Sequence, residues 1–190
     1  MEPQTNNKMA FLKGFLKETG KLALIIIFVI IPFRLYIAQP FMVSGASMEP
    51  TFDNKDYLIV DQISFKIKGL NRQDVVIFRP PTTENTYFIK RVIGFPGETV
   101  NINKGVVSIT QTDGKIIILD EQYILFTKKD DNLNVTLKDN EYFVMGDNRA
   151  GSFDSRSWGP LTSDRIVGRP LVRLFPASEF RIWPGTELNK

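Results

Sequence analysis

The chain of 190 residues contains no histidine and no cysteine, and this absence limits the chemistry that it can perform. A serine nucleophile usually passes its proton to a histidine, cysteine peptidases need a thiol, and most zinc sites use His or Cys ligands. A hydroxyl can then be activated only by a carboxylate, a metal held by oxygen ligands, or a lysine kept neutral by its surroundings. The sequence favours the lysine, with Ser47 and Lys90 as the catalytic pair.

Ser47 lies in the segment VSGASMEPT, residues 43–51, where Gly45, Ala46 and Pro50 indicate a tight turn with little bulk around the hydroxyl. An extended apolar segment leads into this turn and consists of Phe41, Met42 and Val43. Taken alone, a serine among Gly and Pro residues more often serves the turn itself than catalysis. The motif therefore needs a second group before it indicates a nucleophile.

Lys90 lies in the segment YFIKRVIGFPGE, residues 87–98, which has the composition of a strand. Alternate residues of a strand share a face, so Lys90 is expected beside Phe88 and Val92, with Arg91 on the opposite face. Burial on an apolar face disfavours the ammonium form and lowers the pKa, which a lysine base requires near neutral pH. The alternative is a lysine that protects an edge strand from pairing.

The segment MGDNRAGSFDSRSWG, residues 145–159, forms a polar loop directly after an apolar strand. Asp147 and Asn148 are suited to Asx-turns, Asp154 is placed to pair with Arg156, and Ser152 offers a hydroxyl. A structural turn is the alternative interpretation.

Calcium binding and aspartic protease chemistry do not fit this loop. Arg149 falls where an EF-hand would place its second oxygen ligand, and no glutamate occupies the twelfth position. Asp154-Ser155-Arg156 is not the D-S/T-G motif of an aspartic protease. We therefore expect no metal ion and no cofactor.

From about residue 57 onward, short β-branched and alternating runs predict a mainly β body with antiparallel hairpins. The predicted strands are 57–60, 63–68, 75–78, 87–93, 106–110, 116–119, 141–145 and 166–175. Asp113-Gly114 is a hairpin turn signal. Residues 98–140 have polar turns and their own hairpin, so we expect a small cap there. The stretch after residue 176 is rich in Pro and Gly and is not expected to continue the sheet.

The N-terminal segment predicts a membrane anchor. Residues 22–33 are apolar without interruption, and after Arg34 the apolar run resumes to residue 38. A helix over 22–38 would be about 25 Å long, slightly less than a ~30 Å hydrocarbon core. Four lysines precede it, so we expect residues 1–21 in the cytoplasm and a catalytic domain, 39–190, on the other side of the membrane.

A cleavable signal peptide is the competing interpretation of this segment. Cleavage after Ala38 would leave Tyr36 at the third position before the cut and Pro40 just after it, and both are poor choices. Nucleic-acid binding is disfavoured by the charge distribution, since the net charge of +3 lies within residues 1–38 and residues 39–190 are neutral.

In their order along the chain, these motifs resemble those of the type I signal peptidases. The order is an apolar anchor, SGASMEPT, YLIV, RQDVVIF, YFIKRVIGFPGE and GDNR with SFDSRSWG, and it covers roughly residues 20–170. The resemblance implies two antiparallel β-sheets with a site near the membrane surface. It also implies a membrane-bound serine endopeptidase that removes signal peptides from preproteins emerging from the translocation machinery.

The resemblance carries roles to individual residues. Ser47 would be the nucleophile, Lys90 the general base, the Ser47 N–H an oxyanion donor and Ser152 the residue that orients the lysine amine. Supporting residues would be Asp147, Asn148, Arg149, Asp154 and Arg156. Peptide substrate would pair with the segment at 40–43 and with Phe88 and Ile89 as an added strand.

The chain departs from part of the family at the oxyanion hole and in the loop after residue 145. Gly45 stands where some members have a serine that assists the oxyanion, so we expect a backbone donor there. Ala150 and Gly151 stand where Asp and Asn often occur.

Two other classes of protein are alternatives to a signal peptidase. One is a self-cleaving repressor, which needs a DNA-binding domain and no membrane segment, and the other is a non-catalytic membrane-anchored β module. The intact Ser47, Lys90 and Ser152 argue against the second.

Overall fold

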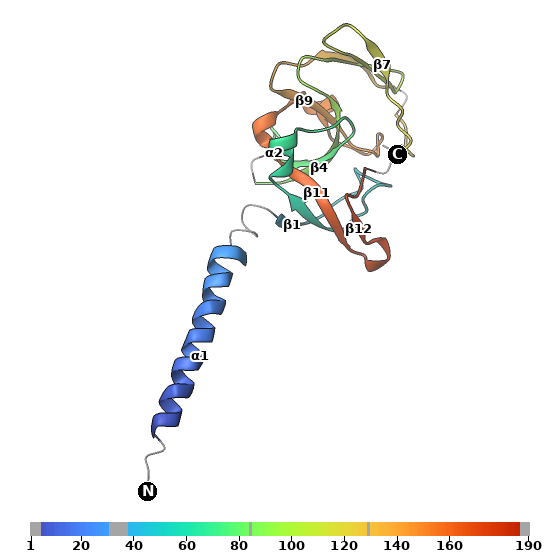
Figure 1. The fold of residues 1–190 in the computed structure, drawn as a ribbon. Coiled ribbons are helices and arrows are strands. Elements are labelled where there is room, and N and C mark those ends of the chain that lie inside the picture. The colour runs from blue at the N-terminus through green and yellow to red at the C-terminus, as the bar shows by residue number, and fades with distance from the viewer. Residues whose placement is uncertain (1–4, 31–37, 84, 129, 187–190) are drawn as a thin grey trace. The chain divides into compact units, whose positions relative to one another are not determined.

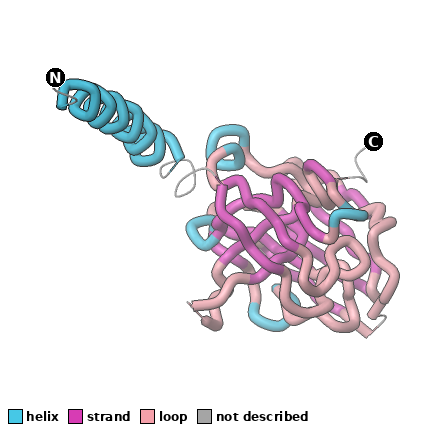
Figure 2. Tube along the Cα trace, turned by 90° about the horizontal axis from the view of Figure 1, so that it is seen from below, coloured by secondary structure: helices cyan, strands magenta, loops and turns pink. Residues whose placement is uncertain are grey.

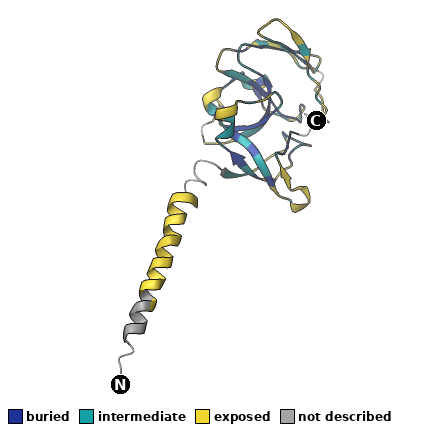
Figure 3. Cartoon of the chain, viewed as in Figure 1, coloured by how far each residue is buried: buried dark blue, intermediate teal, exposed yellow. Residues whose placement is uncertain are grey.

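The computed structural model describes residues 5–30, 38–83, 85–128 and 130–186, and the chain divides into two compact units, residues 1–39 and 40–190 (Figure 1). The N-terminal unit contains helix α1 (Thr5–Ile25), which continues as the π-helical turn η1 (Ile26–Ile30). Leu and Lys are the commonest residues of α1, with four each, and both are good helix formers. The described side chains of this helical segment are exposed (Figure 3).

The predicted membrane span at 22–38 is not confirmed. Within the described residues, no helix has both the length and the apolarity that a membrane crossing needs. Residues 22–30 lie in α1 and η1, while residues 31–37 of the predicted span lie outside the part of the chain that the structure describes.

The body contains two antiparallel sheets, as predicted. The larger sheet has the order β1-β2-β11-β3-β4-β9-β10, with β12 paired to β11. Its strands are β1 (Ala38–Met42), β2 (Tyr57–Asp61), β3 (Val75–Phe78), β4 (Phe88–Gly94), β9 (Glu141–Met145), β10 (Leu161–Thr162), β11 (Ile166–Phe175) and β12 (Arg181–Ile182).

The smaller sheet forms the cap and has the order β7-β6-β5-β8. Its strands are β5 (Thr99–Asn103), β6 (Val106–Thr110), β7 (Ile116–Ile118) and β8 (Asn132–Thr136). Short helices lie around the strands of the body (Figure 2), namely α2 (Ser64–Lys68), α3 (Ser155–Trp158) and the 3-10 turns η3 (Ser163–Arg165) and η4 (Ala177–Glu179).

Strand β3 explains why the run VVIF is continuously apolar. Val75 and Ile77 belong to one buried cluster with Met48, Phe52 and the inner residues of β2. Its alternate residues, Val76 and Phe78, belong to a second cluster on the opposite face. A strand buried on both faces carries apolar side chains at every position, so the strand that pairs with the Lys90 segment is firmly held.

The cap is packed closely against the large sheet through a third cluster, which joins Ile93, Phe143 and Met145 to the inner residues of β5 and β6. β4 ends at Gly94, where a Cβ atom would lie 2.5 Å from Val100 Cγ2 and 2.8 Å from Leu137 Cδ1. Glycine is therefore required sterically at the point where the chain leaves the sheet for the cap.

The predicted strand at 63–68 is wrong, because this segment forms helix α2. The Asp61 carboxylate accepts hydrogen bonds from the N–H groups of Ile63 and Ser64, which starts the turn. The alternating pattern of ISFKIK is too short to distinguish one helical turn from a strand.

Two strands of the cap were not predicted, β5 and β8, because their Asn and Thr residues are typical of turns. These polar residues occupy the exposed face, while Val100 and Ile102 of β5 point inward and are buried. The Asp113-Gly114 turn is confirmed: it joins β6 to β7, and Gly114 has φ +84°.

The expectation for the C-terminal stretch was also wrong. β12 pairs with β11 in antiparallel register, and the Trp183 N–H donates to the Leu171 carbonyl. The Gly185 carbonyl accepts a buried hydrogen bond from Arg91. Pro and Gly here mark the turns on either side of a two-residue strand rather than the end of the sheet.

Candidate active site

Ser47 lies in the turn that follows β1. Val43 and Met48 are buried on either side of it, and the Phe52 N–H donates to the Met48 carbonyl at 3.0 Å. Gly45 has φ +95°, a left-handed conformation that favours glycine. Apolar anchors at both ends thus hold a turn whose small central residues leave the Ser47 hydroxyl accessible.

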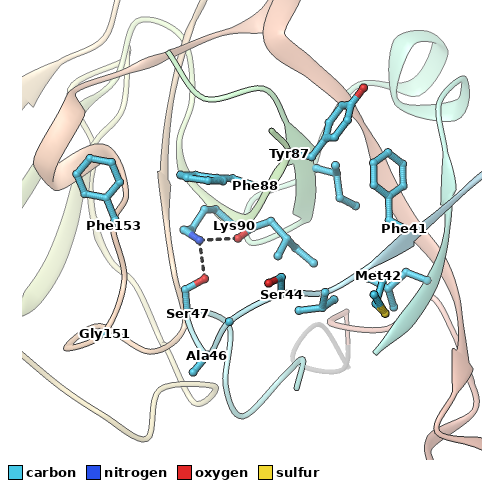
Figure 4. Close-up of a pocket in the computed structure, with 15 residues that line it drawn as sticks. Phe41, Met42, Ser44, Ala46, Ser47, Tyr87, Phe88, Lys90, Gly151 and Phe153 are labelled. Atoms are coloured by element: carbon cyan, nitrogen blue, oxygen red, sulfur yellow. Dashed lines mark hydrogen bonds between the residues drawn. The ribbon is translucent and has the colours of Figure 1, made fainter. Parts of the chain in front are cut away.

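Lys90 projects from the middle of β4, whose residues 88–91 pair with β3. Its Nζ donates to Ser47 Oγ at 2.6 Å and to the Ile89 carbonyl at 2.8 Å (Figure 4). The Phe88 ring lies beside it, with Nζ 5.4 Å from the ring centroid. The predicted strand parity is confirmed, since Lys90 lies on the face of Phe88 and is only 4% exposed.

The environment of Lys90 makes the neutral amine much easier to form than in an exposed lysine. Burial lowers its pKa from 10.5 to about 8, while the negative charges of Asp154 and Asp147 raise it and the positive charge of Arg156 lowers it. The two carboxylates are each paired with an arginine, which limits their effect on the lysine. A neutral amine 2.6 Å from a hydroxyl oxygen is suited to accept its proton.

Asp154 anchors the loop behind the lysine. Its carboxylate accepts two hydrogen bonds from the Arg156 side chain, at 2.8 and 2.7 Å, and one from the Gly146 N–H at 2.9 Å. Burial alone would raise the pKa of Asp154, but Arg156 and the Gly146 N–H together hold it below its ordinary value of 3.8. Asp154 also caps α3 through the Arg156 N–H, as a residue before a helix commonly does.

Asp147 lies on the other face of β4 and binds Arg91. The guanidinium donates to both carboxylate oxygens, at 2.9 and 2.6 Å, and Thr51 donates to the same carboxylate at 2.5 Å. The Arg91 guanidinium carbon also lies 4.1 Å from the centroid of the Tyr123 ring. These contacts connect β4 to the segment after Ser47 and to the cap.

Arg149 joins the same loop to the cap. It donates to both carboxylate oxygens of Glu121 and to the Gly146 carbonyl. The Tyr123 hydroxyl donates to Glu121 at 2.9 Å, and burial followed by the charge of Glu121 raises the pKa of Tyr123.

Ser152 lies next to Gly146, where a Cβ atom would meet the Ser152 Oγ at 2.2 Å and the Ser47 carbonyl at 2.4 Å. The Ser152 hydroxyl helps to lower the pKa of Asp154, yet its buried Oγ has no partner of hydrogen-bond geometry within the described residues. In this conformation Lys90 donates to the Ile89 carbonyl. The predicted contact from Ser152 to the lysine amine is not formed.

Gly45 was expected at the oxyanion hole. Its N–H donates to Asn54 Oδ1 at 3.1 Å and is therefore not available to an oxyanion in this conformation. Asn148 contacts the turn around Ser47 directly, because its N–H donates to the Ser47 carbonyl at 3.1 Å.

A cavity of about 300 Å³ opens beside Ser47 and Lys90. The five residues predicted to contact substrate, Phe41, Met42, Val43, Phe88 and Ile89, all line it. Figure 4 shows Gly151 and Phe153 on one side of the Ser47–Lys90 pair and Phe41 and Met42 on the other. Residues in the lining that the sequence did not indicate are Ser44, Leu58, Ile77, Tyr87 and Phe153.

The sequence did not predict several of the charged and polar partners in this region. Strand parity predicts that Arg91 lies on the face opposite Lys90, but it does not identify the carboxylate partner of Arg91. Thr51 carries no signal beyond its position in the turn. Glu121 and Asp131, which pair with Arg149 and Arg156, lie in the cap and carry no local signal of this role.

Comparison with known proteins gives consistent matches. A family model described as "Signal peptidase, peptidase S26" matches residues 16–175. Probable signal peptidase I-1 of Synechocystis is 36% identical over 173 residues, which are 87% of this chain and 86% of the relative. Signal peptidase I T of Bacillus subtilis is 35% identical over 175 residues, 86% of this chain and 88% of the relative. The crystal structure of a signal peptidase I from Enterococcus faecalis is similar with a TM-score of 0.46 and 28% identity, covering 54% of this chain and 97% of that one.

Proposed function

Because the chain belongs to the signal peptidase family, peptidase S26, and is a serine peptidase of the signal peptidase I type, we propose that it cleaves signal peptides with a Ser47–Lys90 dyad. The observation that supports the dyad is the 2.6 Å contact between Lys90 Nζ and Ser47 Oγ, formed by a lysine that is only 4% exposed. Without a histidine or a cysteine in the chain, this lysine is the base closest to a reactive hydroxyl in the cavity.

The reaction begins when neutral Lys90 takes the Ser47 proton and Oγ attacks the carbonyl carbon of the scissile peptide bond. The oxyanion is stabilised by the Ser47 N–H. Collapse of the tetrahedral intermediate breaks the C–N bond, and the Lys90 ammonium gives its proton to the leaving amine. Water then loses a proton to the neutral amine of Lys90 and attacks the carbonyl carbon of the acyl-enzyme. The ester C–O bond breaks, the Lys90 ammonium returns the proton to Ser47 Oγ, and the signal peptide is released.

Substrate binding as an added strand is supported by the pairing of β4. Residues 88–90 pair with β3, but pairing with β9 begins only at Arg91, so the start of β4 lacks a neighbour on that side in the described pairings. β1 is the end strand of the sheet order. An extended peptide between these two segments would lie along the cavity that contains Ser47.

Membrane anchoring is part of this proposal. The apolar side chains described from Leu22 to Ile30 are all exposed, and the large ones are between 39% and 71% exposed. An apolar helical face without a packed partner is typical of a helix in lipid. We propose a single span over 22–38 in the cell membrane, with residues 1–21 cytoplasmic and the body on the opposite side, where preproteins emerge from the translocation machinery.

Two variants test the dyad. Ser47→Ala and Lys90→Ala should each abolish cleavage of an exported preprotein by the detergent-solubilised protein, because each removes one of the two reacting groups. Near-normal turnover by either variant would refute the mechanism.

The topology has a separate test that uses the absence of native cysteine. Single cysteines introduced at Lys8 and at Asp113 should differ in reactivity toward a membrane-impermeant maleimide applied to intact cells. Only the cysteine at position 113 should be labelled. Labelling of both positions, or of position 8 alone, would contradict the proposed orientation.

A further inference from the structure

The loop after β9 holds the main chain on both sides of Ser47, and a single residue makes both contacts. The Asn148 N–H donates to the Ser47 carbonyl at 3.1 Å, and the Asn148 Nδ2 donates to the Ala46 carbonyl at 3.1 Å. These two carbonyls belong to the peptide units that flank the nucleophile. Asn148 is 102 residues away from Ala46 in sequence, so the contact exists only in the folded protein.

The orientation of the Asn148 amide follows from its own partners. The Gly151 N–H donates to Asn148 Oδ1 at 3.0 Å, so the carbonyl end of the amide must face Gly151. The NH₂ end then faces the Ala46 carbonyl, which needs a donor. The amide is therefore fixed at both ends, and reversing it would leave a donor facing a donor and an acceptor facing an acceptor.

Fixing the Ala46 carbonyl also fixes the Ser47 N–H. Both belong to one planar trans peptide unit, in which the C=O and the N–H point in opposite directions. A carbonyl held on the side of Asn148 therefore directs the Ser47 N–H to the opposite side. The Glu49 N–H also donates to the Ala46 carbonyl, at 3.3 Å, which leaves Asn148 as the shorter of the two contacts.

We propose that Asn148 is a positioning residue that holds the two peptide units flanking Ser47 and thereby aims the Ser47 N–H at the oxyanion. This inference rests on the proposed function, in which Ser47 is the nucleophile. The direction of the Ser47 N–H matters because the Gly45 N–H already donates to Asn54 Oδ1 and cannot also donate to the oxyanion in this conformation. An oxyanion donor contributes only when it is aligned before the reaction begins.

The test compares Asn148→Ala and Asn148→Asp with the wild-type chain in detergent. Asn148→Ala removes the side-chain contact to Ala46 and keeps the backbone contact to Ser47. Asn148→Asp keeps an acceptor for the Gly151 N–H but presents a carboxylate oxygen to the Ala46 carbonyl. Turnover of a signal-peptide substrate should be compared at about pH 9.5, where a change in Lys90 protonation has little effect.

We expect kcat to fall about tenfold for Asn148→Ala and further for Asn148→Asp, with KM within about twofold. Complete loss of an oxyanion donor costs roughly 10²–10³-fold in kcat, and a misaligned donor should lose part of that. The acidic limb of the Asn148→Ala pH profile should stay in place, because Lys90 keeps its surroundings. A merely structural role would move KM, the pH profile and kcat together.

Asn134→Ala is the matched control, because Asn134 is exposed on β8 of the cap. It should keep wild-type kcat. The inference would be overturned if both Asn148 variants kept kcat within twofold of wild type at about pH 9.5, or if KM changed and kcat did not. If Asn148→Ala does not fold, Asn148→Asp decides, since it keeps the contact to Gly151. Activity of Ser47→Ala would instead refute the proposed function, so the two failures are distinguishable.

Discussion

Replacing Lys90 with methionine should stabilise the fold while it destroys the activity. The reason is that the buried charge of Lys90 lowers the free energy of unfolding. The side chain is only 4% exposed in the folded protein, and its pKa falls from 10.5 to about 8. Methionine has similar length and an uncharged, flexible side chain that suits the apolar face beside Phe88.

The size of the effect follows from the lowered pKa. Each tenfold change in an acid dissociation constant corresponds to roughly 1.4 kcal/mol, so the difference between 10.5 and about 8 amounts to about 3 kcal/mol. The unfolded chain binds more protons than the folded one between pH 8 and pH 10.5. The lysine therefore costs about 3 kcal/mol below pH 8, and this cost disappears as the pH rises through that window.

The measurement is urea unfolding of the full chain in detergent, followed by the fluorescence of Trp158 and Trp183. The free energy of unfolding of Lys90→Met minus that of wild type should be about 3 kcal/mol larger at pH 7 than at pH 10.5. The lost hydrogen bonds to Ser47 and Ile89 subtract a constant amount at both pH values. Lys115→Met, which removes an exposed charge, corrects for the change in net charge.

A stability difference between Lys90→Met and wild type that stays the same from pH 7 to pH 10.5 would refute this reasoning. The lysine would then be protonated to the same extent in the folded and unfolded states. The explanation of its basicity by burial would fail, even if the variant were inactive.

Three further predictions concern the same site and its support. The wild-type kcat/KM should rise with pH along an acidic limb whose midpoint lies near pH 8, as neutral Lys90 is formed, and should level off above that; a flat profile from pH 5 to pH 9 would rule out a titrating base. Asp154→Asn should move the midpoint of this limb to lower pH, because it removes the carboxylate charge that raises the Lys90 pKa the most. It should also lower the Tm, because Arg156 loses one of its two carboxylate partners; an upward move of the midpoint would contradict the sign. Gly94→Ala should lower the free energy of unfolding by about 1–3 kcal/mol, because the new Cβ atom collides with Val100. The midpoint of the rise of kcat/KM with pH should not change. An unchanged Tm would show that the cap can shift at little cost.

Much of the fold was accessible from local patterns. Strands with β-branched runs or clear alternation, such as VVIF at 75–78, appear where the sequence predicts them. Segments that carry conflicting local signals were misjudged: 63–68 alternates but is a helical turn, and 132–136 looks polar but is a strand. In both segments, contacts with distant strands or with a capping carboxylate outweigh the intrinsic helix or strand propensity of the residues.

The sequence by itself determined which reacting groups are possible. A chain without histidine or cysteine has few ways to activate a hydroxyl, and strand parity places Lys90 on the face of Phe88. Both arguments need only residue identity and period, because the alternation of side chains is a property of the strand itself.

The tertiary structure alone decided where these groups lie and what surrounds them. Lys90 meets Ser47 across 43 residues of chain, and its lowered pKa comes from burial by segments that the local sequence does not specify. Distant segments also meet where Arg149 pairs with Glu121 and where Asn148 donates a hydrogen bond to the Ala46 carbonyl. Desolvation and hydrogen-bond direction depend on which atoms surround a group, and only the folded chain fixes those neighbours.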